Sequence, residues 1–213
     1  MKAHSKRRTA APKAKKKASR PAVAAGELPV LGFAKPTDWW RWLKRHHASA
    51  PGLWVKIAKK NSGLASIDRL QALEGALCFG WIDGQGRSID ATHFMVKFTP
   101  RGVRSVWSKI NRAKALALIE RGDMQPAGLR EVERAQQDGR WDAAYDSPRT
   151  ATVPDDLAGA LEAKPEAKAF FAQLSAANRY AILWRLQTAK KAETRARRIR
   201  LFVEMLERGE TLH

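Results

Sequence analysis

The chain has 213 residues, of which 44% are hydrophobic and eight are tryptophan, so it can bury a substantial core in one domain, or in one domain with a small helical appendage. No apolar run reaches the roughly 18 residues of a membrane span, and no apolar signal-peptide core follows the basic N-terminus, so we expect a cytoplasmic location. The only cysteine, Cys78, excludes an intrachain disulfide and a zinc site built from several thiolates.

The net charge of +19 is unevenly distributed. Residues 1–25 carry six lysines and three arginines and no acid, which leaves +10 for the rest of the chain. They hold few large apolar side chains to offset the entropy cost of ordering, so we predict a disordered basic tail. Its cations favour non-specific, salt-sensitive binding of nucleic acid, although a solvated tail that only aids solubility fits equally well, because no aromatic residue interrupts the charges. The clustered cations are Lys13, Lys15, Lys16, Lys17 and Arg20.

The next part of the chain, residues 26–150, shows mixed helix and strand patterns. A helix is predicted from Pro36, with an apolar stripe that includes Trp39 and Leu43, and Ala50-Pro51-Gly52 ends it. Leu53 to Lys59 alternates with period two, which indicates a strand. A helix from Ser66 to Phe79 follows, and its predicted stripe is Leu70, Leu73 and Leu77, with Glu74 in the same arc. A carboxylate in that position needs a partner.

The run from Leu77 to Asn111 is the most informative stretch of the sequence. Its glycines between Gly80 and Gly86 permit a sharp turn, and two neighbouring strands are predicted, one from Trp81 and one from His93 to Phe98. Ser105 is predicted to cap the next helix, whose stripe would be Val106, Ile110, Ala113 and Ala117.

The end of the chain reads as helical. After a short helix over 127–137 and an ordered loop over 138–146, the polar residues 147–153 mark a boundary. Four helices are then predicted, over 154–163, 165–174, 176–189 and 192–208. The expected fold class is therefore α+β: a small antiparallel sheet of about three strands packed with helices in residues 26–150, followed by an all-helical segment, residues 151–213, packed on that core.

Several polar and aromatic residues are candidates for a ligand pocket. Arg195 falls inside the apolar arc of the last helix, where a guanidinium needs a carboxylate or a bound anion, so we expect it to meet the Leu77 to Asn111 stretch. The predicted pocket for a small polar or anionic ligand is lined by Trp81, Asp83, Arg87, Arg101, Trp107, Asn111 and Arg195.

The sequence assigns no reaction to this pocket. Asp83 or Glu74 could serve as a general base, but there is no Ser-His-Asp order, metal-binding triad or phosphate loop, so whether the protein is an enzyme stays open and we expect no cofactor or metal. The pair His46 and His47 points to different helix faces and is assigned to the helix surface. Cys78 is expected to be a small buried residue rather than a nucleophile.

Six sequence blocks resemble, in order, the bacterial YdeI/OmpD-associated family, whose label refers to bacteriocin protection. They are ALCFGWIDG (76–84), FTPR (98–101), SVWSKIN (105–111), GDMQPAGL (122–129), DGRWDAAY (138–145) and AKKAETRARRI (189–199). The resemblance covers about residues 36–209 and implies an α+β domain with the family's helical C-terminal segment. It names no substrate, and the basic tail lies outside it.

Three functions of different classes follow. The first is a cytosolic domain associated with stress or resistance that binds a small polar or anionic ligand in the pocket above. The second is a nucleic-acid accessory protein that acts through the basic tail. The third is a protein interaction module whose exposed tryptophans contact an unidentified partner.

Overall fold

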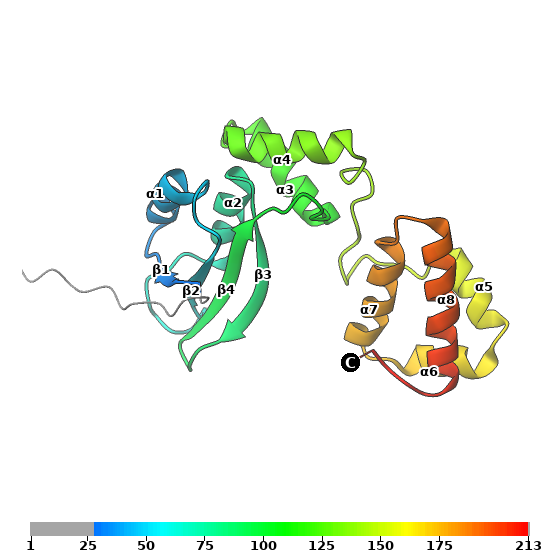
Figure 1. Ribbon diagram of the computed structural model, residues 1–213. Helices are drawn as coiled ribbons and strands as arrows, with labels where there is room; N and C mark the ends of the chain where they lie inside the picture. Colours follow the sequence, from blue (N-terminus) through cyan, green and yellow to red (C-terminus); the bar gives the residue numbers. More distant parts are fainter. Residues whose placement is uncertain (1–27, 213) are drawn as a thin grey trace, which may run out of the picture.

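The computed structural model describes residues 28–212, and the predicted basic tail lies outside the described residues. Within this range the chain forms a four-stranded sheet with four helices, followed by four more helices (Figure 1). The elements in chain order are β1 (Val30–Gly32), α1 (Pro36–His46), β2 (Leu53–Ala58), α2 (Arg69–Cys78), β3 (Trp81–Ser88), β4 (His93–Pro100), α3 (Lys109–Glu120), α4 (Pro126–Gln137), α5 (Asp155–Glu162), α6 (Pro165–Gln173), α7 (Ala176–Gln187) and α8 (Ala192–Glu207).

The α+β class is confirmed, but the sheet is larger than expected and not purely antiparallel. Its strand order is β1-β2-β4-β3, with β1 parallel to β2 and the other pairs antiparallel. The predicted neighbours β3 and β4 form a hairpin, with a register shift between Asp83 and Gly86. Sequence periodicity did not reveal β1, because three residues are too few to display an alternating pattern.

The period-two pattern places one face of the sheet in the core. Leu53, Val55 and Ile57 of β2 are buried while the residues between them are half-buried, as predicted. Helices α1 and α2 pack against each other, and α2 also contacts β3 (Figure 1). Trp39 is fully buried and donates from its indole nitrogen to the Ala72 carbonyl oxygen at 3.0 Å, so α1 is fixed to α2 by a hydrogen bond as well as by packing.

Two helices begin later than predicted. Asp68, not Ser66, caps α2, where it forms a capping box with Gln71. Ser108, not Ser105, caps α3 by accepting from the Asn111 backbone N–H at 3.1 Å. In both cases the earlier serine is used elsewhere, because Ser66 accepts from Ala58 N–H and Ser105 accepts from Gly102 N–H.

The apolar stripes predicted for these two helices are partly wrong. Leu70 is exposed, although Leu73 and Leu77 are buried. In α3, Ala115 and Leu118 face the core while Ile110, Ala113 and Ala117 are exposed. Alanines occur on several faces of α3, so periodicity alone did not identify the face that packs against α2.

The buried apolar side chains form two separate clusters, and we use them to name two regions. The sheet region, residues 28–150, contains the cluster that runs from Trp39 to Ala144. The helical region, residues 151–212, contains the cluster from Leu157 to Leu206. In the helical region, α8 contacts α5, α6 and α7, and the four helices match the predicted ones to within about two residues at each end.

A loop joins the two regions through specific contacts. The Asp146 backbone N–H donates to Gln187 of α7 at 2.9 Å, and the Tyr180 hydroxyl donates to the Asp146 carbonyl oxygen at 2.8 Å. The rings of Tyr145 and Trp184 meet edge-to-face at 6.1 Å. Helix α7 is therefore held against the end of this loop by side chains from both regions.

None of the helices that the structure describes combines the length and the apolar character needed to cross a bilayer.

Candidate functional site

Three arginines hold the loop that follows β4, residues 101–107. Arg134 donates to the Gly102 carbonyl oxygen at 3.4 Å, Arg140 to that of Ser105 at 2.6 Å and Arg101 to that of Val106 at 3.3 Å. Each guanidinium therefore donates a hydrogen bond to a backbone carbonyl of a loop that contains no regular secondary structure. These arginines come from the end of β4, from α4 and from the loop after α4, so the arrangement depends on tertiary structure.

Arg101 is a buried cation stacked on an indole. Its side chain reaches from the end of β4 so that the guanidinium carbon lies 3.5 Å from the centre of the Trp107 ring, which is a cation–π contact. Arg101 is only 6% exposed, and this burial lowers the pKa of its guanidinium to about 10. The carboxylates of Glu131 and Asp83 act electrostatically to raise the pKa of Arg101, but neither of these described residues lies within ion-pair distance of it.

Arg140 is equally buried and lines a small cavity. It is 6% exposed, and its Nε donates to both carboxylate oxygens of Asp138 at 2.7 Å. Desolvation raises the pKa of Asp138, but the hydrogen bonds from Arg140 outweigh it and lower that pKa overall. The cavity beside Arg140 has a volume of about 70 Å³, which holds more than one water molecule. It is lined by Val106, Arg140, Ala143, Gln187, Thr188, Ala189 and Lys190.

The side-chain groups without partners around this loop are all donors. Arg101 Nε and Nη2, Trp107 Nε1, Arg134 Nε and Arg140 Nη2 are buried and have no hydrogen-bond partner among the described residues. A buried N–H group that lacks an acceptor costs free energy, and a charged one costs more. Because none of these five atoms can accept a hydrogen bond, a ligand that satisfied them would have to supply acceptor oxygens.

Tyr145 and Asp83 complete the surroundings of Arg101. The Tyr145 backbone pairs with the start of α3, donating to the Trp107 carbonyl oxygen at 3.0 Å and accepting from Lys109 N–H at 2.8 Å. Burial raises the pKa of the Tyr145 hydroxyl, and the nearby Asp83 carboxylate adds to that rise. Asp83 itself forms an ion pair with Arg69 at 3.0 Å. We call the set Arg101, Trp107, Arg134, Arg140 and Tyr145 the arginine cluster.

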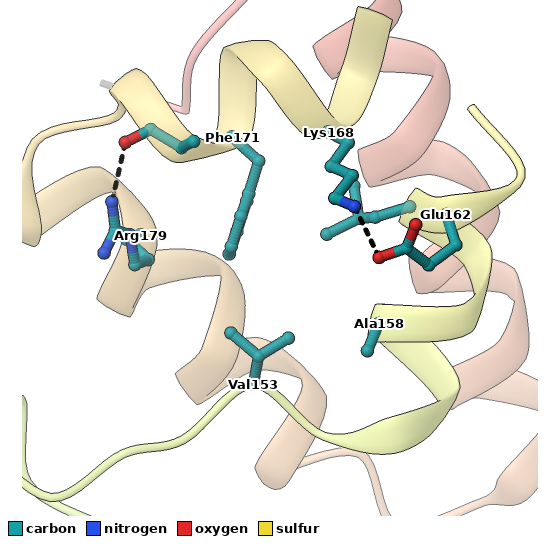
Figure 2. A pocket seen from close by; sticks show the side chains of 8 residues that line it. Val153, Ala158, Glu162, Lys168, Phe171 and Arg179 are labelled. Carbon is teal, nitrogen blue, oxygen red and sulfur yellow. Dashed lines mark hydrogen bonds and ion pairs between the residues drawn. The ribbon is translucent and has the colours of Figure 1, made fainter. Parts of the chain in front are cut away.

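The helical region contains a second and larger hollow, a groove bounded by α5, α6 and the start of α7 (Figure 2). Its volume is about 440 Å³, within the usual range for small-molecule pockets. Apolar side chains make up most of the wall, and charged groups stand at its edges. The lining residues are Val153, Ala158, Leu161, Glu162, Lys168, Phe171, Ala172 and Arg179.

Two family models match different parts of the chain. Residues 31–131 match a domain of unknown function, DUF8412. Residues 150–209 match the family described as bacteriocin-protection, YdeI or OmpD-associated. The predicted YdeI/OmpD-associated family is thereby supported for this C-terminal segment. No curated protein and no solved structure matches the chain.

The YdeI/OmpD-associated match is shorter than the resemblance predicted from the sequence blocks. Of the six blocks, only AKKAETRARRI (189–199) lies inside it, and DGRWDAAY (138–145) lies between the two matches. The other four blocks fall in the DUF8412 match. The groove therefore belongs to the YdeI/OmpD-associated segment, whereas Arg101, Trp107 and Asp83 belong to the DUF8412 segment.

Of the seven residues predicted to line one pocket, Arg101 and Trp107 are in direct contact, and Asp83 acts on Arg101 only electrostatically. Trp81 is buried in the core, where its indole donates to the His47 carbonyl oxygen at 3.0 Å. Arg87 lies over the Trp54 ring at 4.9 Å, on the outer face of the sheet. Asn111 is half-buried in the first turn of α3, and its side chain makes no hydrogen bond to another residue of the range 28–212.

Arg195 does not join this group, which corrects the expected meeting with the Leu77 to Asn111 stretch. Its Nε and Nη2 donate to the two carboxylate oxygens of Asp156 at 2.6 and 2.8 Å, and its Nη1 donates to the Leu186 carbonyl oxygen at 2.8 Å. The guanidinium thus finds both a carboxylate and a carbonyl inside the helical region. The inward arginine needed a partner, as predicted, but the partner comes from α5 rather than from the sheet region.

Glu74 and Cys78 lie elsewhere in the sheet region. Glu74 pairs with Arg121 at 3.5 Å, which supplies the partner that a carboxylate on this helix needs. Cys78 is fully buried, and desolvation raises the pKa of its thiol to about 12, so the thiolate is disfavoured. No cluster of three or more His, Cys, Asp or Glu side chains with metal-binding geometry occurs within residues 28–212.

Sequence reasoning missed Arg134, Arg140 and Tyr145. Arg140 and Tyr145 stand in the block DGRWDAAY, within the stretch 138–146 that the sequence predicts to be an ordered loop. The adjacent Arg140 and Trp141 are the sequence feature that could have indicated this site, because a loop guanidinium beside a tryptophan often packs among aromatic rings. Nothing in the sequence indicated that this loop returns to residues 101–107.

Proposed function

We propose that the protein binds a small oxyanion at the arginine cluster, in the cavity beside Arg140. The observation that carries this proposal is Arg140, which lines the cavity and whose buried Nη2 has no hydrogen-bond partner among the described residues. The other four donors without an acceptor belong to Arg101, Trp107 and Arg134, which lie around the same loop but do not line the cavity. A phosphate- or carboxylate-type group supplies several acceptor oxygens and a negative charge, so it would offset the desolvation of Arg140.

The position of the cavity supports an anionic rather than a neutral ligand. Arg140 and Lys190 both line it, and no acidic residue does. Gln187 adds a side-chain amide, whose Nε2 donates one hydrogen bond to Asp146 Oδ2 at 3.2 Å and carries a second N–H. Because Gln187 ends α7 and Thr188 to Lys190 follow it, the ligand would contact both regions and connect the DUF8412 and YdeI/OmpD-associated segments.

The family description also motivates a biological setting for this binding. The C-terminal segment matches a family named for bacteriocin protection. We propose that anion binding at the junction of the two regions serves a protective or stress-related role in the cell.

The test is calorimetric titration of the whole chain with inorganic phosphate and with sulfate, after dialysis against a chloride buffer. We expect saturable binding that also raises the melting temperature, because a ligand that binds only the folded state stabilises it. Lys190→Met should weaken binding about tenfold, since it removes an exposed cation from the cavity without disturbing a buried hydrogen bond. Arg140→Met should abolish binding.

Arg104→Met is the matched control, because Arg104 is an exposed arginine in the same loop. It should bind phosphate and sulfate like the unsubstituted protein. Equal weakening by Arg104→Met and Lys190→Met would mean that only the general positive potential attracts the anion, and the absence of saturable binding by the unsubstituted protein would refute the proposal.

A second candidate function, nucleic-acid binding, is favoured by the nine cationic residues among residues 1–25. We propose that Lys13, Lys15, Lys16, Lys17 and Arg20 contact phosphates without reading sequence. Deleting residues 1–25 should reduce DNA affinity strongly at low salt, and the remaining affinity should depend less steeply on salt. Full retention of DNA binding after the deletion would exclude the tail as its origin.

A further inference from the structure

The groove of the helical region has the properties of a binding site that is independent of the arginine cluster. We propose that it binds a small amphipathic carboxylate, with the aliphatic chain along the apolar wall and the carboxylate at Arg179. No residue of this groove belongs to the cavity beside Arg140, so the two proposals stand on separate observations.

The wall of the groove is apolar along most of its length. Leu161 of α5 and Phe171 of α6 form the floor with their partly accessible edges, and both belong to the core of the helical region. Ala158 and Ala172 leave space because their side chains are short, and Val153 closes one side from the segment before α5 (Figure 2). An aliphatic chain that lies here removes apolar surface from water on both partners.

The charges at the edges of the groove differ in a way that selects the ligand's head group. At one edge, Glu162 and Lys168 pair with each other at 2.6 Å and so neutralise one another (Figure 2). At the other edge stands Arg179, and among the described residues no carboxylate lies within ion-pair distance of it. The net charge of the lining is therefore one positive charge, located at Arg179.

Arg179 is also held in a position suited to receive a carboxylate. Its Nη2 donates to the Ala172 carbonyl oxygen at 2.9 Å, and its guanidinium carbon lies 5.7 Å from the centre of the Phe171 ring. Its Nε is buried and has no hydrogen-bond partner among the described residues. A fixed guanidinium beside an aromatic wall, with a donor still available, matches a planar anion that continues into an apolar chain.

The size of the groove limits the chain length. A volume of about 440 Å³ accommodates a medium-length aliphatic acid rather than a long lipid tail. We therefore predict that hexanoate, octanoate and decanoate bind with rising affinity. Each added methylene should lower the dissociation constant about fourfold until the groove is filled, because about 0.8 kcal/mol accompanies each buried methylene.

The first experiment is calorimetric titration of the whole protein with this series below the micellar concentration, with octanamide as the neutral probe. Octanoate should bind about tenfold more tightly than octanamide to the unsubstituted protein. In Arg179→Met the two probes should bind equally, while the increase with chain length should persist because methionine preserves the apolar part of the side chain. Arg197→Met, at an exposed arginine on α8, should behave like the unsubstituted protein.

The second experiment fills the groove. Ala172 is exposed on α6, so Ala172→Phe should leave the fold intact and occupy the space of the aliphatic chain. We expect octanoate binding to fall at least tenfold, with unchanged circular dichroism and melting temperature. Undiminished binding in folded Ala172→Phe, an affinity independent of chain length, or a preference for octanoate that survives in Arg179→Met would each overturn the proposal.

Discussion

The sheet region and the helical region treat their inward-facing arginines differently. In the helical region, Arg195 is met by both oxygens of Asp156 and by the Leu186 carbonyl oxygen, so each of its three nitrogens donates a hydrogen bond. In the sheet region, Arg101 and Arg140 are more deeply buried and still have N–H groups without an acceptor. A complete set of partners indicates a structural role, whereas the incomplete set is the observation behind the proposed anion site.

The origin of the partners differs as well. Asp156 and Arg195 lie on two helices that contact each other within one small bundle. The arginine cluster combines the end of β4, α4 and the loop after α4 around residues 101–107. The helical region therefore satisfies Arg195 internally and leaves Arg179 Nε and Asn178 Oδ1 on α7 without partners among the described residues, whereas the sheet region leaves its donors without partners near the junction between the two regions.

The largest expected effect tests whether the two clusters of buried residues are independent. Trp39→Ala should destabilise the sheet region by about 3–5 kcal/mol, because it removes a fully buried indole and its hydrogen bond to Ala72. Denaturation followed by backbone NMR should show early loss of sheet-region signals and unchanged helical-region signals. Phe171→Ala should produce the converse pattern, since Phe171 belongs to the other cluster. Loss of both sets of signals together in either variant would contradict independence.

A comparably large effect concerns Cys78, which reports opening of the sheet region. Its pKa is raised from 9.0 to about 12, so the thiolate fraction at pH 8 should be about a thousandfold below that of the unfolded chain. Labelling by iodoacetamide should be more than about a hundredfold slower in native protein than in denaturant. Between pH 9 and 12 the unfolded chain loses this proton first, so the sheet region should become less stable as pH rises.

The variant Asp156→Asn is the matched control for this labelling, because it perturbs only the helical region. It should leave the labelling rate of Cys78 unchanged. Faster labelling in this variant would show that the two regions open together.

Substitutions at two glycines, one in each region, should change stability by an intermediate amount. A Cβ at Gly128 of α4 would lie 2.5 Å from the Cys78 carbonyl oxygen and 2.7 Å from that of Leu77, so Gly128→Ala should destabilise the sheet region by about 2–3 kcal/mol. A Cβ at Gly159 of α5 meets nothing within 4 Å, so Gly159→Ala should stabilise the helical region by up to about 1 kcal/mol. Thermal unfolding measures the change in stability of both variants. A change of the same sign in the two variants would contradict the close approach of α4 to the end of α2.

The smallest effect concerns the ion pair of the helical region. Arg195 donates hydrogen bonds to Asp156 and thereby lowers the pKa of this carboxyl. Asp156→Asn should cost about 1 kcal/mol at neutral pH, since the pair is bidentate but partly exposed. Because the pKa of Asp156 is lower in the folded than in the unfolded chain, the ion pair stabilises the fold at pH values above the unfolded-state pKa. This stabilisation is lost as the pH falls through the folded-state pKa. The stability difference between variant and unsubstituted protein should therefore disappear in acid, and a constant difference would exclude the ion pair as its cause.

Sequence by itself determined most of the secondary structure. The period-two pattern of residues 53–58 and the proline and serine signals before α6 and α7 gave correct elements, because these signals act within a few residues of the chain. It also determined that Arg195 would need a partner and that Cys78 would be buried. The sequence did not predict β1, because three residues are too few to show a pattern. It also did not identify the face of α3 that packs against α2, because alanines occur on several faces of this helix.

Only the tertiary structure decided which charged groups meet. Arg101 and Trp107 were candidates from sequence, but Arg140 joined them because the loop after α4 returns to residues 101–107, and Arg195 left them because Asp156 of α5 lies beside α8. Periodicity tells which face of an element is apolar, and it carries no information on which distant segment will cover that face. The partners of buried charges, and hence the candidate sites, are set by that packing.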